Sequence, residues 1–446
     1  GIAGDRVLAA VETCAVSPGV SIPSNGSKVL PPSIVGAPLP NPQGSPAFAP
    51  LPQVSLLLAG GISALPAEPG TPPTYTGAVV ALDADVGTFQ TLPGPVLTTP
   101  FTLAPTGTIL LADGTILIVG ATQPEPFPQP TTTMTGFAWT FDPTTGLSTA
   151  AGAPIAPRIG ATLSLLANGT VLYAGGYGLG DDGYAVLDTA EVYDPKSRTF
   201  RKVGNKMTTP RCGHSATVLT DGSVLLAGGF AVPPITYDLP GLEAIYVPSL
   251  HTAETFATAT QTFTAIATVL DRGFALHSAT LLANGDVLIA GGFSAFQSEA
   301  PFDEIQIWPI TQAAVFNIAA QAFATIADMP VPRAMHSATL LPDARVLLAG
   351  GAIDWTMEPS ASSVLFDPTS FAFSAGPMLD AARRSQGAVL VEQGVLMLGG
   401  DTNSTYEIVP PDGGSTQPVY PLPIVLPSPD YPNLVSLTEG VNPIPL

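Results

Sequence analysis

A motif of about twenty residues recurs along this chain, and it restricts the possible folds more than any other feature. The motif reads PRCGHSATVLTDGSVLLAGG at residues 210–229 and PRAMHSATLLPDARVLLAGG at residues 332–351, with LHSATLLANGDVLIAGG between them at residues 276–292. Similar apolar runs end elsewhere at Gly60-Gly61, Gly175-Gly176 and Gly399-Gly400, and once at Gly120-Ala121. A spacing of roughly 50 to 60 residues between these pairs predicts a repeat protein built from one small unit.

A turn signal divides each repeat into two strands. It stands between two short apolar runs, at Asp113-Gly114, Asn168-Gly169, Asp221-Gly222 and Asn284-Gly285, with Asp343-Ala344 and Gln393-Gly394 as variants. Asp-Gly and Asn-Gly favour positive φ angles, so we expect a tight two-residue hairpin turn in each unit.

A second pair of strands follows each Gly-Gly. An aromatic residue or leucine is followed seven residues later by phenylalanine in five units: Leu82 and Phe89, Tyr193 and Phe200, Phe256 and Phe263, Phe316 and Phe323, and Phe366 and Phe373. Phe141 and Leu147 are one residue short of this spacing. Asp-Pro between several of these pairs marks another hairpin. The pattern therefore predicts four short antiparallel strands in each unit.

Sheets this small bury both faces when they pack radially around one axis. We therefore predict an all-β fold, a seven-bladed β-propeller of four-stranded antiparallel blades over residues 46–410. Residues 1–45 and 411–446 are rich in proline and are expected to form an N-terminal arm and a C-terminal arm. The segments DRVLAAVET and QPVYPLPIVL are candidates for strands that complete a sheet and close the ring.

The pattern R-x-x-H-S-A-T-x-L-x-D-G-x-V-L-x-x-G-G, followed by Y-D-P-x-x-x-x-F, resembles the kelch repeat. In particular, it is similar to the bacterial kelch-type form that resembles the propeller domain of galactose oxidase. The resemblance covers about residues 50–410 and implies the propeller fold, which by itself hosts many functions. Phenylalanine or leucine stands where kelch units typically have a tryptophan on the fourth strand.

Composition excludes several classes of partner. The 446 residues include 14 Lys and Arg against 34 Asp and Glu, a formal net charge of −20. This charge repels nucleic acids and anionic lipids, and no run of 18 apolar residues occurs, so we expect neither nucleic-acid binding nor a membrane-spanning segment. Few charges and many Thr, Ala, Gly and Pro residues favour an extracytoplasmic bacterial protein, in the periplasm, at the cell surface or secreted.

The arginine and histidine of the motif are candidates for a site. Arginine precedes the first strand at Arg158, Arg211, Arg333 and Arg383. The motif position three residues after the arginine position holds histidine at His214, His277 and His336, and other units have Thr106, Ala161 and Gln386 there. Alternating strand directions bring these positions to one face, so the arginines should ring the mouth of an axial channel. Two interpretations stay open: hydrogen bonds between neighbouring blades, which we favour, and a binding mouth for an anion.

The resemblance to galactose oxidase implies a copper site of two histidines and two tyrosines, one of them crosslinked to cysteine. The histidines of this chain are the three of the motif and His251, in an insertion, and no matching tyrosine pair is found. We therefore expect no copper-radical chemistry, no metal site and no cofactor. The sialic acid mutarotases resemble this fold too, and no set of residues points to their reaction.

Insertions after the second strand differ from unit to unit, which makes them the natural place for specific binding. Their aromatic residues Phe127, Tyr237, Tyr246 and Trp308 are candidates for contacts with a partner. The two cysteines, Cys14 and Cys212, are candidates for a disulfide that holds the N-terminal arm, and a buried thiol at Cys212 is the alternative.

Our leading hypothesis is a non-catalytic binding or assembly protein that uses the insertion face and the two arms. Its partner would be another protein or a surface glycan, within a larger assembly. The alternative is a carbohydrate-active enzyme or lectin of the galactose-oxidase-like type. The sequence identifies no catalytic residue.

Overall fold

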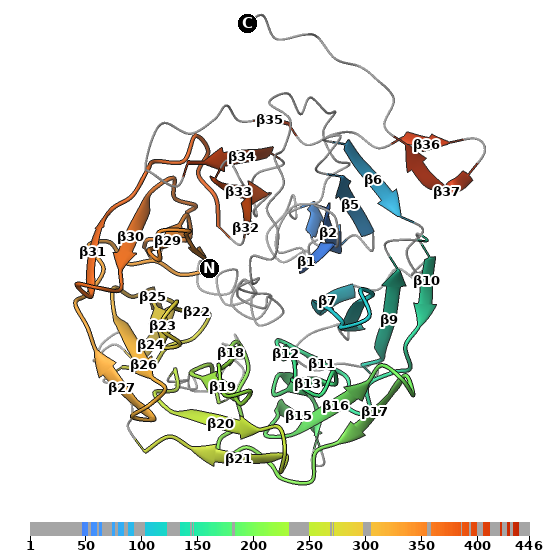
Figure 1. The fold of residues 1–446 in the computed structure, drawn as a ribbon, viewed down its shortest axis with the longest axis horizontal. Coiled ribbons are helices and arrows are strands. Elements are labelled where there is room, and N and C mark those ends of the chain that lie inside the picture. The colour runs from blue at the N-terminus through green and yellow to red at the C-terminus, as the bar shows by residue number, and fades with distance from the viewer. Residues whose placement is uncertain are drawn as a thin grey trace, which may run out of the picture.

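The protein, described here by a computed structural model, is a ring of antiparallel β-sheets around a common centre (Figure 1). The structure describes residues 103–410 except 123–133, 143–144, 146, 181–182, 232–248, 268–269, 271, 298–304, 355–357, 385, 392–393 and 399–404, and also the strands within residues 47–92 and 420–436. Every regular element in these segments is a strand. The described residues include no helix that could cross a membrane. The prediction of an all-β fold is confirmed.

Six sheets have four strands each, with the first strand nearest the centre and the fourth at the rim (Figure 1). From the centre outward they are β7 (Leu103–Leu110), β8 (Ile116–Thr122), β9 (Gly136–Asp142), β10 (Leu147–Ala150); β12 (Thr162–Leu165), β13 (Val171–Ala174), β16 (Ala190–Asp194), β17 (Thr199–Lys202); β18 (Ser215–Val218), β19 (Val224–Ala227), β20 (Ala253–Ala257), β21 (Thr262–Ala265); β22 (Ser278–Leu281), β23 (Val287–Ala290), β26 (Ala313–Asn317), β27 (Ala322–Thr325); β28 (Ser337–Leu340), β29 (Val346–Ala349), β30 (Ser363–Asp367), β31 (Ala372–Ala375); and β32 (Gly387–Val391), β33 (Gly394–Leu398), β34 (Thr405–Val409), β35 (Tyr420–Pro421).

The remaining large sheet has six strands. Their order is β1 (Ala47–Leu51), β2 (Ser55–Ala59), β5 (Val79–Asp83), β6 (Thr88–Leu92), β37 (Tyr431–Ser436) and β36 (Leu426–Ser428). The segment QPVYPLPIVL supplies β35, which pairs with β34, so the chain beyond residue 410 does complete a sheet. The other candidate, DRVLAAVET, lies outside the described residues, as does the arm of residues 1–45. The number of seven blades stays a prediction, because this sheet departs from the four-stranded unit.

Three small ribbons extend from the insertions that follow second strands. They are β3 (Ile62–Ala64) with β4 (Thr74–Tyr75), β14 (Tyr177–Gly180) with β15 (Gly183–Val186), and β24 (Phe293–Gln297) with β25 (Ile305–Pro309). A short strand, β11 (Arg158–Ile159), pairs with β14 and connects that ribbon to the start of its sheet.

In the sheets that begin with β7, β12, β18, β22 and β28 the first hairpin has a three-residue loop, so the predicted two-residue turn is wrong there. Between β32 and β33, Val391 pairs with Gly394, which leaves two residues between the strands. In the loop after β18, the Gly222 N–H donates to the Leu219 carbonyl at 3.0 Å, and the Leu219 N–H donates to the Ser223 carbonyl at 2.8 Å. Gly222 has a φ of 82°, and Asp221 is not among the residues with positive φ. Asp221 Oδ1 instead accepts from the N–H and hydroxyl of Ser223, which favours a type I turn followed by a left-handed glycine.

The hydrophobic core lies between neighbouring sheets. Alternate residues of β19 serve its two sides: Leu225 and Ala227 pack toward the sheet that begins with β22, whereas Val224 and Leu226 pack toward the sheet that begins with β12. Strands buried on both faces in this way are apolar throughout, as the runs before Gly-Gly are. Each sheet therefore depends on both neighbours for its stability.

The aromatic pairs predicted from the sequence face each other across the third and fourth strands. Phe256 lies opposite Phe263, with ring centroids 4.9 Å apart, and Phe316 and Phe323 repeat this at 5.1 Å. The unit with the short spacing differs, because Ser148 lies opposite Phe141 and the side chain of Leu147 is exposed.

The Gly-Gly pair is explained by the close approach of the next sheet. Gly228 and Gly229 have φ angles of 63° and 95°. The Gly229 N–H donates at 2.7 Å to the carbonyl oxygen of Phe274, in the segment leading into β22. A Cβ atom on Gly229 would lie 2.6 Å from the carbonyl oxygen of Cys212. Both the left-handed backbone and the lack of space require glycine here, so the pair marks a structural repeat.

Candidate functional site

The four motif arginines lie just before the first strands of their sheets, and all are fully buried. Arg158, Arg211, Arg333 and Arg383 each have 0% exposed surface. A buried guanidinium needs hydrogen-bond acceptors and a counter-charge in its surroundings. The contacts of each arginine therefore show whether it serves the fold or a ligand.

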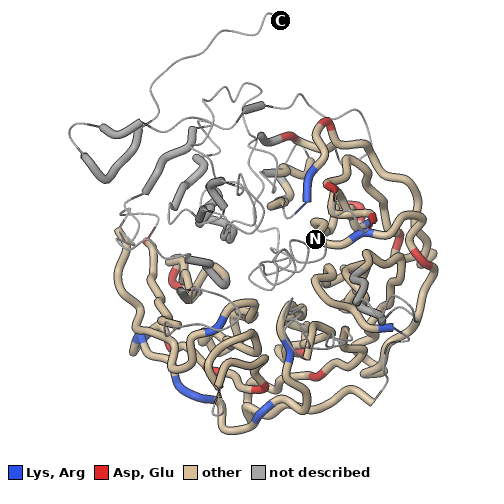
Figure 2. The backbone as a smooth tube through the Cα atoms, turned by 180° about the vertical axis from the view of Figure 1, so that it is seen from behind, with Lys and Arg blue, Asp and Glu red and all other residues tan. Residues whose placement is uncertain are grey.

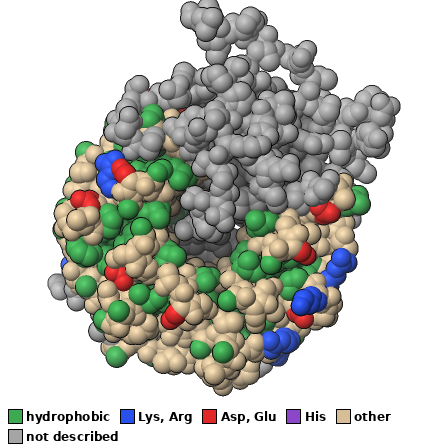
Figure 3. Space-filling view, viewed as in Figure 1, with side chains coloured by type: hydrophobic (Ala, Val, Ile, Leu, Met, Phe, Trp, Pro, Cys, Tyr) green, Lys and Arg blue, Asp and Glu red, His purple; other side chains and the backbone are tan. Residues whose placement is uncertain are grey.

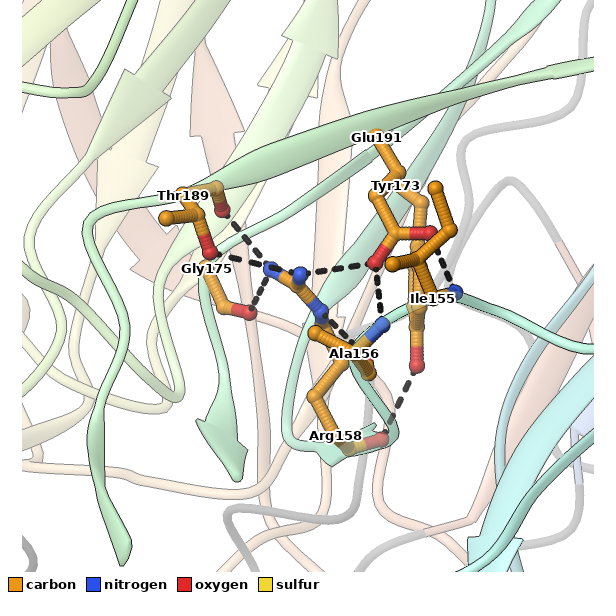
Figure 4. A network of polar contacts seen from close by, with 7 residues as sticks. All are labelled: Ile155, Ala156, Arg158, Tyr173, Gly175, Thr189 and Glu191. Atoms are coloured by element: carbon orange, nitrogen blue, oxygen red, sulfur yellow. Dashed lines mark hydrogen bonds and ion pairs between the residues drawn. The ribbon is translucent and has the colours of Figure 1, made fainter. Parts of the chain in front are cut away.

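Arg158 binds the third strand of its own sheet (Figure 4). Its guanidinium donates to the carbonyl oxygens of Gly175 and Thr189, at 3.0 and 2.7 Å, and to Glu191 Oε1 at 3.0 Å. Tyr173 donates its hydroxyl proton to the Arg158 carbonyl oxygen, and its ring lies 5.2 Å from the guanidinium carbon. The arginine thus clamps the inner strands of one sheet together.

The same clamp recurs in two other sheets. Arg211 donates to the Gly228 and Thr252 carbonyl oxygens and to Glu254 Oε1 at 2.8 Å. Arg383 donates through Nε to Glu407 Oε1 at 2.7 Å. Sequence reasoning placed these contacts between adjacent blades, and the structure corrects this: the guanidinium contacts lie within one blade. In the contacts that the structure describes, the arginine backbone reaches the preceding sheet, as when the Arg211 carbonyl accepts from the Gly176 N–H at 2.8 Å.

Each glutamate of the clamp also orders the loop that enters its sheet. Glu191 accepts from the N–H groups of Ile155 and Ala156, both at 2.8 Å, and Glu254 accepts from Thr208 N–H at 2.7 Å. Sequence reasoning missed these glutamates. A signal was present, because Glu191 and Glu254 both stand two residues before the aromatic residue of the third strand.

Arg333 has no carboxylate in its clamp among the described residues. It donates to the Gly350 and Ser362 carbonyl oxygens and to Ser362 Oγ, and Val364 occupies the glutamate position. The entering loop has Pro330 where the other clamps have an N–H donor, so a glutamate would lack this partner. Burial without a counter-charge lowers the pKa of Arg333 to about 10.

The motif histidines connect neighbouring sheets. His214 Nε2 lies 3.0 Å from Thr162 Oγ1, and His277 Nε2 lies 2.8 Å from Ser215 Oγ, in each case on the first strand of the preceding sheet. Two further pairs of neighbouring sheets repeat the contact, with His336 bonded to Ser278 at 2.9 Å and Gln386 to Ser337 at 3.2 Å. The hydroxyl that follows each histidine therefore bonds to the histidine, or to Gln386, of the next sheet.

Burial keeps these histidines neutral. Burial, together with the nearby Arg211 guanidinium, lowers the pKa of His277 to about 3. Burial also lowers the pKa of His214 and of His336 well below the usual value. The imidazoles are therefore uncharged hydrogen-bonding groups at neutral pH.

No described residue of the predicted binding mouth offers a charged group to solvent. The four guanidinium groups are enclosed by their own sheets, and an anion would reach them only if a sheet opened. Binding of a ligand by these arginines and histidines stays a prediction, and the described contacts give all seven side chains a structural role.

An apolar cluster joins several sheets at the face where the first strands begin. It includes Ile159, Cys212, Phe230, Leu276 and Phe293, all buried. Cys212 therefore lies in an apolar environment, which is what a buried thiol at this position would require. Cys14 lies outside the described residues, so the disulfide stays a prediction.

Of the four aromatic loop candidates, the structure describes Trp308, on β25, with a partly exposed side chain. Phe127, Tyr237 and Tyr246 lie outside the described residues. The ribbon β14–β15 provides two aromatic residues that sequence reasoning did not select: Tyr177 and Tyr184 stack with ring centroids 6.1 Å apart. The Tyr184 hydroxyl accepts from the Met134 N–H at 2.8 Å, which connects this ribbon to the preceding insertion.

The described residues do not fit a copper centre. The three buried histidines belong to different sheets, and each engages its Nε2 atom with a hydroxyl group. Nδ1 of His214 faces the glycine pair so closely that a Cβ on Gly175 would lie 3.3 Å away. Within the described segments, no three His, Cys, Asp or Glu side chains are grouped as metal ligands.

Comparison with known proteins places the fold. No protein-family model and no curated protein sequence matches the chain. A fungal alcohol oxidase of the AA5 family, solved in complex with copper, superposes with a TM-score of 0.59 at 18% identity, over 84% of this chain and 73% of the oxidase. The structure of YjhT superposes with a TM-score of 0.51 at 15% identity, over 77% of this chain and 99% of YjhT. At these identities the likeness shows the fold alone, and that fold is a β-propeller.

Proposed function

We propose that this chain is a non-catalytic binding protein that recognises its partner with the ribbons of the insertion face. One observation carries the proposal. The repeated arginines and histidines are buried and hydrogen-bonded within the sheets, whereas the ribbon β14–β15 carries side chains that no other unit repeats. Leu179 on this ribbon is 43% exposed, next to the Tyr177 and Tyr184 stack. Apolar and aromatic groups on a rigid scaffold suit either a protein partner or a sugar ring.

The base of the ribbon is held firmly enough to present such a surface. Tyr177 and Val186 pack in the apolar cluster with Phe230 and Phe293, so the ribbon is anchored on several sheets. A preorganised surface of this kind loses little conformational entropy when a partner binds. The composition favours an extracytoplasmic location, where the partner is another protein or a surface glycan.

The experiment is crosslinking of the full chain in extracts of its own source, followed by identification of crosslinked peptides, together with a glycan array. We expect the native chain to bind a partner through the ribbons and Leu179→Asp to lose at least tenfold in affinity. Leu147→Asp is the matched control, because Leu147 is also an exposed leucine, 63% exposed, but lies on the outer strand β10. Equal loss in both variants would remove the ribbon from the proposal.

The alternative is a carbohydrate-active enzyme or lectin, supported by the fold shared with a copper alcohol oxidase. Metal analysis of copper-loaded protein and an assay for peroxide produced from alcohols and galactose separate the two. Stoichiometric copper with turnover would overturn the binding proposal in favour of an oxidase.

A further inference from the structure

The exposed cations of this acidic chain are concentrated at one outer strand. Five of its 14 Lys and Arg residues lie within residues 196–206, and all five are exposed: Lys196, Arg198, Arg201, Lys202 and Lys206. We call this group the β17 stripe, after the strand that it follows. Side chains of Lys and Arg gather at the lower right rim in Figure 3, where Figure 1 labels β17, and Figure 2 shows cationic segments on the same part of the rim from behind.

Other outer strands at the same position carry no charge. Their sequences are LSTA in β10, TFTA in β21, AFAT in β27 and AFSA in β31, against TFRK in β17. The aromatic pairing that defines the strand is the same in β17, where Phe200 packs against Tyr193. The charges are therefore not required by the repeat.

Contacts within the protein account for only part of the stripe. Arg201 donates to Gln261 Oε1 at 2.8 Å, and Lys206 pairs with Asp188 at 3.2 Å. The side chains of Lys196, Arg198 and Lys202 make no hydrogen bond or ion pair with any residue in the described segments. Unpaired cations that lie together repel one another, and an external anion relieves this repulsion.

We propose that the β17 stripe binds a linear polyanion, an acidic polysaccharide with carboxylate or sulfate groups. The stripe follows the outer edge of one sheet: its cations lie on β17, in the turn before that strand and in the loop after it. This shape fits a single polymer chain better than a flat anionic membrane, because the adjacent outer strands add no cations. β17 itself has four residues, too few for a peptide to gain much by adding a strand to its edge.

The net charge of −20 does not prevent this binding. Charges further away than about 10 Å are screened at ordinary ionic strength, so a polyanion at the rim responds mainly to the stripe. Within residues 188–206 the exposed or partly exposed carboxylates are those of Asp188 and Asp194, and the five cations outnumber them. The stripe lies on the outer wall and not on the ribbons, so this inference does not depend on the proposed function.

The test measures binding of the full-length protein to sodium alginate, a polymer of uronic acids, with neutral dextran as the uncharged polymer. The stripe variant changes Lys196, Arg198 and Lys202 to Gln together. The matched control changes Arg272, Arg345 and Arg384 to Gln, which removes the same net charge from residues outside the stripe. All six side chains reach solvent, and the ion pair of Arg345 with Asp343 that the control removes lies at the surface, so both variants should stay close to the native melting temperature.

We expect the native protein to bind alginate and not dextran, with an affinity that falls as salt is added. The stripe variant should bind about tenfold more weakly or worse, and the control should stay within about twofold. Equal weakening in both variants would show that only the overall charge matters and would overturn the proposal. Tighter binding to poly-L-glutamate than to alginate, or to phosphatidylglycerol vesicles in preference to both, would also overturn it and assign the stripe to an acidic peptide or a membrane.

Discussion

Two neighbouring sheets fill the same buried position differently, one with an ion pair and the other with apolar side chains. Before β18, Arg211 is clamped to Glu254, and both side chains are fully buried. Before β22, the same two positions hold Phe274 and Ala314, which pack in one apolar cluster. Cation and carboxylate have thus been replaced together in this sheet, whereas the sheet that begins with β28 keeps Arg333 without a carboxylate and satisfies it with oxygens of Gly350 and Ser362. The comparison indicates that the clamp serves the fold and that its charges are exchangeable as a pair.

The largest effect should come from breaking the pair on one side. Glu254→Ala leaves the Arg211 guanidinium buried without its counter-charge and removes the acceptor for Thr208 N–H. We expect a loss of about 3 to 5 kcal/mol in the free energy of unfolding, measured by urea denaturation. A loss below about 1 kcal/mol would show that the ion pair adds little to the clamp.

The hydrogen bond between the same two sheets, joining His277 and Ser215, should make the free energy of unfolding depend on pH. His277 binds Ser215, and burial lowers its pKa from 6.5 to about 3. The unfolded chain takes up a proton below pH 6.5 and the native state does not, so this histidine's contribution is complete above pH 6.5 and is lost as the pH falls. Between pH 6.5 and 4.5 the loss is about 2.5 kcal/mol from this residue.

His277→Gln tests this effect, because Gln386 already fills the equivalent position in another joint. The variant should be destabilised little at pH 7 and should show a shallower decline of unfolding free energy from pH 6.5 to 4.5. An unchanged slope would mean that His277 does not contribute to acid sensitivity.

A smaller effect is expected when the buried ion pair of one sheet is replaced by the apolar pair of the next. Arg211→Phe with Glu254→Ala copies Phe274 and Ala314 into the preceding sheet. We expect the double variant to lie within about 1.5 kcal/mol of the native protein and to recover most of what Glu254→Ala loses. A double variant as unstable as Glu254→Ala would show that the space around Arg211 cannot accept the aromatic ring.

The smallest effect concerns the first hairpin loop, which both sheets close with glycine and the following sheet closes with Ala344. Ala344 has a φ of 70°, a left-handed conformation that costs a residue with a Cβ about 1 kcal/mol. Ala344→Gly should therefore raise the melting temperature slightly. Gly169→Ala is the reverse control, because its Cβ would meet no atom within 4 Å and only the backbone is strained.

Much of the fold could be predicted because its signals are local. The pair Phe256 and Phe263 lies on two strands joined by one hairpin, and Gly222 stands inside the turn that it allows. The loop length could not be predicted, because Asp-Gly suits several turn types. The hydrogen bond from the Ser223 N–H to Asp221 Oδ1 favours one of them. Residues that pack within one hairpin are close in sequence, so the spacing of aromatic residues and glycines along the chain predicts their contacts.

The site is a different matter, because its contacts join distant parts of the chain. The arginines and histidines were visible as a repeated pattern, but Glu254 lies 43 residues beyond Arg211, and Ser215 lies 62 residues before His277. The aromatic candidates Phe127, Tyr237 and Tyr246 lie outside the described residues and stay predictions. The apolar cluster and the Tyr177 and Tyr184 stack emerge only once the ribbons fold back onto the sheets.

The sequence by itself determined the repeated unit, its four strands, its turns and the places where only glycine fits, since these follow from backbone conformation and from neighbours on the same hairpin. Tertiary structure decided what the polar residues of the unit do. Folding of each sheet brings its arginine onto the third strand of that sheet. Closing the sheets into a ring brings each histidine onto the preceding sheet, and it buries both side chains away from any ligand. Burial is a property of the assembled ring, because a side chain loses its water only when the neighbouring sheet arrives.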